Sequence, residues 1–181
     1  IGPVGCGSLL SDSDRGVDRE AERIKDHQAE PSVKAAFDGM RYYHVAPLHA
    51  NIDRLTTLVA EADLSDDPAV QEVGADFAVA LERLMLVNQL VGDAPAHELS
   101  ECRAVGFGVK FCGGPTNHLV FSTTHTDSLI LADAISAYNR VDDALNYKYS
   151  VWSDCMMEPP PLPLLVDGRC ADSRMYEIMT Q

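Results

Sequence analysis

Four of the five cysteines in this 181-residue chain lie in one segment, between residues 102 and 170. An even set of clustered cysteines is typical of a disulfide framework formed in an oxidising compartment. Zinc ligands usually stand two to four residues apart, whereas nine residues separate Cys102 from Cys112. Fourteen separate Cys155 from Cys170. We therefore expect these four cysteines to form disulfides, which constrain the fold of the segment more than any other feature.

The sequence allows three pairings of these cysteines and does not choose among them. We expect local closure, with Cys102 bound to Cys112 and Cys155 bound to Cys170. The alternative ties the two ends of the segment together. A redox-active pair is disfavoured, because the C-x-x-C spacing that lowers a thiol pKa is absent.

The fifth cysteine, Cys6, follows a run of small residues typical of a bacterial lipoprotein cleavage site. Cys6 is therefore a candidate site for a lipid, and the alternative is an ordinary exported N-terminus with a spare thiol. Residues 7–16 are mostly small and polar, which predicts a flexible leader over residues 1–16.

The charge balance disfavours several classes of partner. The chain has 28 acidic and 14 basic residues, and its formal net charge is -14. Such a surface repels nucleic-acid phosphates and anionic lipids. No apolar run reaches the roughly 18 residues that span a bilayer. We expect no nucleic-acid partner, and contact with a membrane only through a lipid on Cys6.

Apolar residues recur at helical spacing through most of residues 17–92, the predicted helical region. Asn51 is the expected cap of one helix, and Asp66 or Asp67, followed by Pro68, begins the next. The break between these two helices is short, so they are expected to be antiparallel.

The periodicity changes after a linker at residues 93–101. Strands are expected around residues 104–111, 117–123 and 164–166, with a helix capped by Thr126 or Asp127. Asp167-Gly168 predicts a tight hairpin. The fold class is therefore α+β: an N-terminal helical hairpin or small helical unit precedes a small disulfide-stapled antiparallel sheet with one helix. That domain covers 102–172, and 173–181 form a tail.

Several motifs occur in order in the second half: Cys-x5-Gly-x3-Cys-Gly-Gly-Pro from residue 102, Ser-Asp-Cys-Met at 153–156 and Val-Asp-Gly-Arg-Cys at 166–170. Together they resemble an uncharacterised domain of small exported bacterial proteins, commonly lipoproteins, over roughly residues 101–172. The resemblance implies export and disulfides, and it implies no catalytic residues.

The sequence favours a non-enzymatic, exported bacterial protein that binds a protein partner in the cell envelope, for example as an accessory subunit of a larger assembly. The proline-rich stretch 156–165 is apolar and stiff, so it loses little entropy on binding. Its candidate partner-binding residues are Met157, Pro159, Pro160, Pro161 and Leu162. One alternative is a protease inhibitor presenting this loop, and the structural alternative is a rigid crossover packed on the core.

A further alternative is that the protein is an enzyme and not a binding protein, namely a hydrolase that uses His118 or His125. Ser122, His125 and Asp127 lie close together in the sequence, but neighbouring residues of a strand point to opposite faces. No Gly-x-Ser-x-Gly motif is present. The histidines do not have the spacing of a helical metal pair, so we expect neither a metal nor a cofactor.

Overall fold

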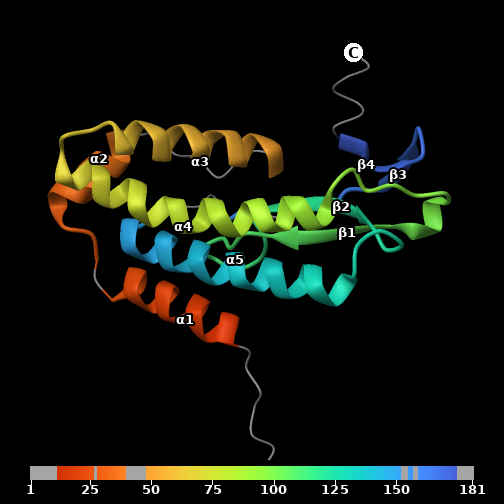
Figure 1. The fold of residues 1–181 in the computed structure, drawn as a ribbon, viewed down its shortest axis with the longest axis horizontal. Helices are drawn as coiled ribbons and strands as arrows, with labels where there is room; N and C mark the ends of the chain where they lie inside the picture. The colour runs from red at the N-terminus through yellow and green to blue at the C-terminus, as the bar shows by residue number, and fades with distance from the viewer. Residues whose placement is uncertain (1–11, 27, 40–47, 152–154, 157–158, 175–181) are drawn as a thin grey trace, which may run out of the picture.

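The computed structural model describes residues 12–26, 28–39, 48–151, 155–156 and 159–174 (Figure 1). Cys6 and Met157, both singled out from the sequence, lie outside the described residues.

The molecule is built on a layer of helices with two small sheets at one end. The helices are α1 (Asp12–Lys25), α2 (Pro31–Gly39), α3 (Leu48–Asp63), α4 (Pro68–Val91) and α5 (Ser128–Tyr149). In Figure 1, α4 and α5 lie side by side at the centre, with α3 next to α4 and α1 next to α5. The predicted antiparallel arrangement of α3 and α4 is confirmed.

Local capping explains where the two central helices begin. The Asp67 side chain accepts a hydrogen bond of 2.9 Å from the Ala69 N–H, and Pro68 occupies the first turn of α4. Asp127 caps α5 in the same way by accepting from Leu129 N at 2.8 Å. Both are predicted caps. The predicted cap at Asn51 is wrong, because α3 already begins at Leu48 and Asn51 is buried inside it.

The strands form two separate antiparallel hairpins. β1 (Cys102–Phe107) pairs with β2 (Asn117–Ser122), and β3 (Pro163–Val166) pairs with β4 (Arg169–Asp172). Asp167 and Gly168 have φ values of 49° and 74°, the left-handed conformations that a tight two-residue turn requires. The short 3-10 helix η1 (Leu99–Glu101) precedes β1. The predicted α+β fold class is confirmed.

A single hydrophobic core runs through the helical and the disulfide-bonded parts. At its centre Tyr149 stacks on Phe37, with ring centroids 4.8 Å apart, and Phe77 lies 5.7 Å from each of these rings. Phe107 of β1 packs on Tyr138 of α5 at 6.2 Å. Because α5 contributes to both aromatic groups, the boundary predicted at residues 93–101 does not divide the core.

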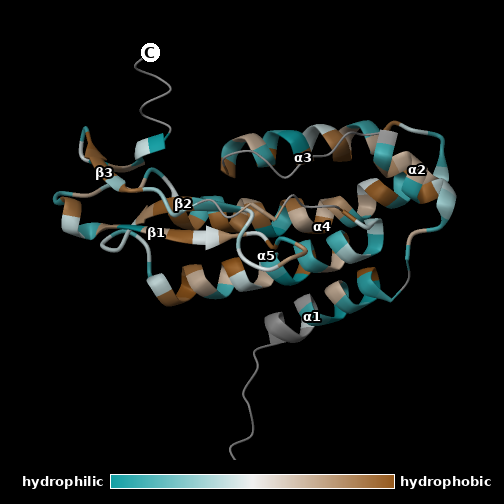
Figure 2. Ribbon diagram, turned by 180° about the vertical axis from the view of Figure 1, so that it is seen from behind, coloured by the Kyte–Doolittle hydropathy of each residue, from teal (hydrophilic) through white to brown (hydrophobic). Residues whose placement is uncertain are grey.

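Helix α1 differs from the others in how it is held. It is largely hydrophilic (Figure 2), and among its described side chains only Ala21 and Ile24 are buried apolar groups. Ion pairs supply the other contacts: Glu20 with Arg83 at 3.0 Å, and Asp18 with Arg140 at 2.8 Å. With so few buried apolar groups of its own, α1 depends on its packing against α5.

Helices α3 and α4 are in close contact at Gly74. A β-carbon added to Gly74 would lie 2.2 Å from the β-carbon of Ala62, well inside van der Waals contact. The absence of a side chain at Gly74 therefore sets the distance between the two helices.

We expect Gly74→Ala to lower the free energy of unfolding by about 1–3 kcal/mol, because the added methyl overpacks this contact. Gly16→Ala in α1 is the matched control, since nothing lies within 4 Å of its added β-carbon. An alanine in an open helical position is neutral or stabilising by up to about 1 kcal/mol. Urea unfolding of the two variants checks this, and equal effects would contradict the proposed contact.

Candidate functional site

Two disulfides join distant parts of the chain. Cys102 is bonded to Cys170 and Cys112 to Cys155, with Cα–Cα distances of 5.4 and 5.8 Å. The predicted local closure is wrong, and the alternative that ties the two ends of the segment together is correct. Strand β1 explains this, because an extended strand rises roughly 3.3 Å per residue and carries the chain away from Cys102 before Cys112 is reached.

The two bridges differ in their surroundings. Cys102, at the start of β1, is only 3% exposed, and Cys170 on β4 is half-buried. We call this pair the inner bridge. Cys112 and Cys155 are both exposed and lie in loops, and we call this pair the outer bridge. The inner bridge connects the two hairpins, whereas the outer bridge connects the loop after β1 to the segment after α5.

Two large apolar side chains flank the outer bridge and face solvent. Phe111 is 77% exposed and Met156 is 66% exposed. The Lys110 ammonium group donates a hydrogen bond to the Met156 carbonyl and so joins the two loops a second time. Phe111, Met156 and the outer bridge together form what we call the outer-bridge surface.

The loop that carries Phe111 is fixed to α5 by polar side chains. Asn139 Oδ1 accepts from Gly108 N and Asp142 Oδ2 accepts from Val109 N, both at 2.8 Å. Asn146 Nδ2 donates to Val109 O at 2.7 Å. These three α5 residues are spaced along one face of the helix. The role of these three residues was not predicted from the sequence. The polar residues next to the apolar positions of α5 could have indicated it.

The predicted partner-binding stretch is placed only in part. Pro159, Pro160 and Leu162 are exposed, and Leu162 is 75% exposed. Pro161 is buried, so this residue anchors the stretch to the protein. Residues 159–162 form neither helix nor strand, and the Leu162 carbonyl accepts a hydrogen bond from Ser173 N at 3.3 Å.

A buried charge cluster lies at the other end of α5. Asp76 of α4 is 1% exposed and accepts hydrogen bonds from Lys148 Nζ at 2.6 Å and from the Tyr149 hydroxyl at 2.9 Å. Lys148 also donates to Glu72 at 2.8 Å, and Arg23 of α1 lies 3.4 Å from Asp76. Spacing in the sequence gives no indication of this cluster, because its members come from three helices.

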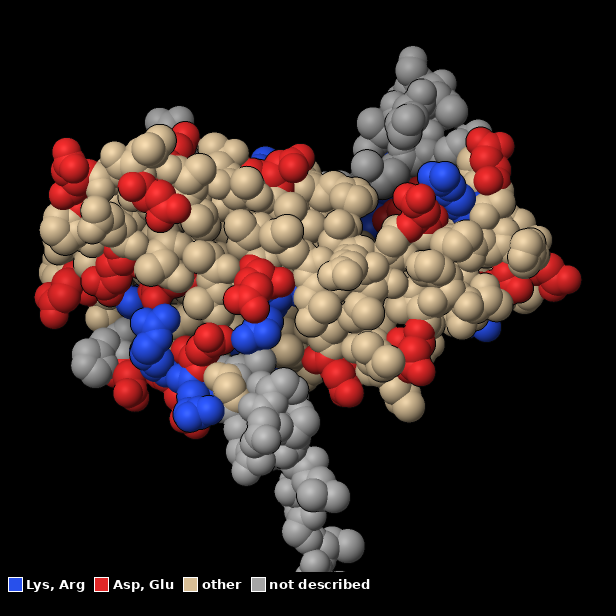
Figure 3. All heavy atoms as spheres, viewed as in Figure 1, with Lys and Arg blue, Asp and Glu red and all other residues tan. Residues whose placement is uncertain are grey.

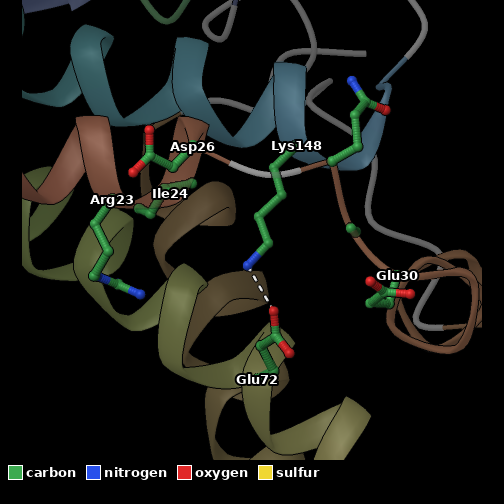
Figure 4. Close-up of a pocket in the computed structure, with 8 residues that line it drawn as sticks. Arg23, Ile24, Asp26, Glu30, Glu72 and Lys148 are labelled. Carbon is green, nitrogen blue, oxygen red and sulfur yellow. Dashed lines mark hydrogen bonds and ion pairs between the residues drawn. The ribbon is translucent and has the colours of Figure 1, made fainter.

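The charge cluster borders a cavity of about 340 Å³. Figure 4 shows Lys148 extending from α5 to Glu72, with Arg23 and Glu30 on opposite sides. Burial opposes the charged form of Lys148, but the hydrogen bonds and negative charges of Asp76 and Glu72 outweigh it and raise the Lys148 pKa. A lysine with a raised pKa stays protonated, so this amine is suited to ion pairing and not to nucleophilic or base catalysis.

The histidines proposed for a hydrolase lie in different surroundings. His118 is half-buried on β2 opposite Gly106, whereas His125 is exposed in the turn after β2. Ser122 is fully buried, and its hydroxyl lies 2.9 Å from that of Thr124. The Asp127 carboxylate already accepts backbone N–H groups as the cap of α5. The residues that suggested a triad therefore have structural contacts of their own.

Comparison of the chain with protein-family models, with curated proteins and with solved structures finds no match. Within the described residues, no group of three His, Cys, Asp or Glu side chains could hold a metal ion. None of the described helices is long and apolar enough to span a membrane. The two disulfides indicate an oxidising location outside the cytoplasm.

Peptide mapping under non-reducing conditions should recover one peptide pair containing Cys102 with Cys170 and another containing Cys112 with Cys155. The bridges close loops of 68 and 43 residues. By lowering the entropy of the unfolded chain, each bridge stabilises the folded state by roughly 4 kcal/mol. Replacing both cysteines of either bridge by alanine should therefore lower the unfolding midpoint. Recovery of Cys102 with Cys112 would contradict the arrangement.

The charge cluster predicts a loss of stability at alkaline pH. Burial and the neighbouring Asp76 charge raise the pKa of Tyr149, and the pKa of Lys148 is raised as well. Both groups keep their protons more tightly in the folded state, so their stabilisation is present below about pH 10 and is lost as the pH rises further. Urea unfolding between pH 8 and pH 11, values chosen around the ordinary tyrosine pKa of about 10, measures this loss.

Tyr149→Phe should reduce the alkaline loss of stability, because the variant has no phenol to titrate at this site. Tyr147→Phe is the matched control, since Tyr147 lies on the same helix and is 46% exposed. The control should keep the wild-type pH dependence. An unchanged pH dependence in Tyr149→Phe would contradict the role given to the cluster.

Proposed function

We propose that the protein is exported and binds a protein partner in the cell envelope through the outer-bridge surface. One observation carries this proposal: Phe111 and Met156, two large apolar side chains, are held exposed beside a disulfide. Exposed apolar side chains scattered singly are ordinary, but a group of them fixed in one place is typical of an interaction site.

The geometry of the loop supports binding with a small entropic cost. Three side chains of α5 hold the backbone of residues 108–109, and the outer bridge fixes Cys112. A loop already ordered in the free protein loses little conformational entropy when a partner binds. Aromatic residues and methionine are also enriched among side chains that anchor protein interfaces. Phe111 is therefore the leading anchor and Met156 the second.

The proline-rich stretch extends the same proposal. Pro159, Pro160 and Leu162 are exposed a few residues after Cys155, and buried Pro161 holds the stretch against the protein. Prolines restrict the backbone before binding, so this stretch adds exposed area with little further ordering. We propose that it forms the edge of the interface, beside the outer-bridge surface.

Charge suggests what kind of surface the partner presents. Figure 3 shows acidic side chains over much of the drawn face, with most of the basic ones gathered beside α1. The formal net charge of -14 repels an acidic partner at long range. The partner surface is therefore apolar at its centre and neutral or basic around it.

The resemblance noted in the cysteine segment supports a bacterial envelope, in the periplasm or at the outer surface, and Cys6 is the proposed lipid attachment site. Intact mass spectrometry of the protein purified from its source measures the lipid directly. The mass of an unmodified Cys6 in the envelope-bound protein would exclude the anchor. That result would leave the binding proposal standing, because the proposal rests on Phe111 and Met156 and not on a lipid.

The binding proposal is tested by comparing immobilised wild-type protein with Phe111→Ser/Met156→Ser against a solubilised envelope extract. We expect the double variant to lose the retained partner, since interface anchors typically contribute about 2 kcal/mol or more each. Leu64→Ser is the matched control, because Leu64 is 87% exposed at the end of α3, away from the outer bridge. Retention by all three proteins, or by none, would exclude this surface.

A protease assay separates partner binding from protease inhibition. An inhibitor that presents the stretch around residues 156–165 would slow a secreted protease, and Leu162→Ser would weaken the effect. A panel of secreted proteases unaffected by micromolar protein would remove this alternative.

A further inference from the structure

We infer that the outer bridge, Cys112–Cys155, is a thiol–disulfide exchange site that a dithiol reductant opens while the inner bridge, Cys102–Cys170, stays closed. The inference concerns the chemistry of the bridge itself. Only its last step, the effect on partner binding, rests on the proposed function.

The two bridges differ in how accessible their cysteines are to a thiol in solution. Exchange requires a thiolate to approach a disulfide sulfur, so exposed disulfides are the labile ones. Both cysteines of the outer bridge are exposed, whereas Cys102 of the inner bridge is 3% exposed. An attacking thiol can approach either cysteine of the outer bridge from solvent, whereas at the inner bridge Cys102 is buried and Cys170 is only partly exposed.

The backbone around each bridge reinforces this difference. Cys170 lies in β4, opposite Leu165 of β3, and its N–H donates to the Ala94 carbonyl at 2.9 Å. Cys155 lies outside any helix or strand and has a φ of 57°, a conformation that is unfavourable for a residue with a β-carbon. Opening the outer bridge lets Cys155 relax, whereas opening the inner bridge disturbs paired strands.

The exchange follows ordinary dithiol chemistry. A thiolate of the reductant attacks Sγ of Cys112 or Cys155, the protein S–S bond breaks, and a mixed disulfide forms while the displaced thiolate takes a proton from water. The second thiol of the reductant then attacks the mixed disulfide. The protein is left with two thiols, and the reductant leaves as its cyclic disulfide after giving up two electrons.

Reduction changes the outer-bridge surface on one side only. The loop at residues 108–109 stays on α5 through the contacts with Asn139, Asp142 and Asn146. On the other side, the hydrogen bond from Lys110 to the Met156 carbonyl is a noncovalent contact between the two loops, and it does not replace the covalent bond. Phe111 therefore keeps its place while Met156 loses its covalent tie to it. A partner that needs both anchors binds the reduced protein more weakly.

The test uses the whole folded protein and dithiothreitol as the dithiol. Samples equilibrated with increasing dithiothreitol are alkylated under native conditions, and each cysteine is quantified by peptide mass spectrometry. We expect Cys112 and Cys155 to be alkylated at a dithiothreitol concentration about tenfold or more below that needed for Cys102 and Cys170, a difference of about 30 mV in potential. Simultaneous opening of the two bridges, or earlier opening of the inner one, would overturn the inference.

Two double variants serve as controls. Cys112→Ser/Cys155→Ser keeps only the inner bridge and should show the wild-type resistance of Cys102 and Cys170. Cys102→Ser/Cys170→Ser should keep an outer bridge that opens at the wild-type concentration. If this second variant does not fold, circular dichroism of the selectively reduced wild type decides instead: an unchanged spectrum supports local opening, and global unfolding overturns it.

The effect on binding is measured last, with the wild type reduced only at the outer bridge and alkylated there. We expect weaker retention of the envelope partner than with the oxidised protein. Unchanged retention would overturn the regulatory step and leave the exchange chemistry established. If the oxidised protein retains no partner, the proposed function fails, while the alkylation pattern still decides whether the outer bridge is the exchange site.

Discussion

The packing of α5 against its neighbours is the interaction on which the rest of the structure depends. Its apolar face, which includes Tyr138 and Leu145, is fully buried between α4 and the first hairpin. Its polar side chains hold the loop after β1 at one position, and at the C-terminal end Lys148 pairs with Asp76. One helix thereby fixes the core, the loop that carries Phe111 and the end of the helical layer. A change in the tilt of α5 would alter all three together.

The disulfides add covalent support to the two small sheets and to the loops beside them. The two hairpins have two strands each, and such small sheets are marginal in water without further support. The inner bridge joins these hairpins at their buried side. Both cysteines of the outer bridge are exposed, and this bridge joins two loops whose apolar residues face solvent. Both bridges stabilise the folded chain, and the exposed one is also the bridge to which we assign the proposed role in recognition.

Local signals in the sequence predicted most of the secondary structure. The caps at Asp67 and Asp127 and the Asp167-Gly168 turn depend on neighbouring residues, so the sequence was enough to place them. Contacts between distant residues were not predictable in this way. The cysteine pairing depends on where β4 lies relative to β1. The burial of Asn51 and the partners of Asp76 depend on how the helices pack. Of the candidate site, the cysteines and the exposed prolines were anticipated, whereas Phe111 and its support by α5 were not.

The contacts between α5 and the loop after β1 have an evolutionary consequence. The printed contacts of Asn139, Asp142 and Asn146 with this loop go to main-chain atoms of Gly108 and Val109, so these contacts impose no requirement on the side chains that follow. Glycine is required at position 108, where a β-carbon would lie 1.7 Å from the Thr116 hydroxyl, and it is favoured at Gly113 and Gly114, whose φ values are 87° and 85°. Other positions of the loop, such as Phe111, are then free to diversify while the scaffold stays constant. A lineage could acquire new ligands by altering the tip alone, much as variable loops do on other rigid frameworks.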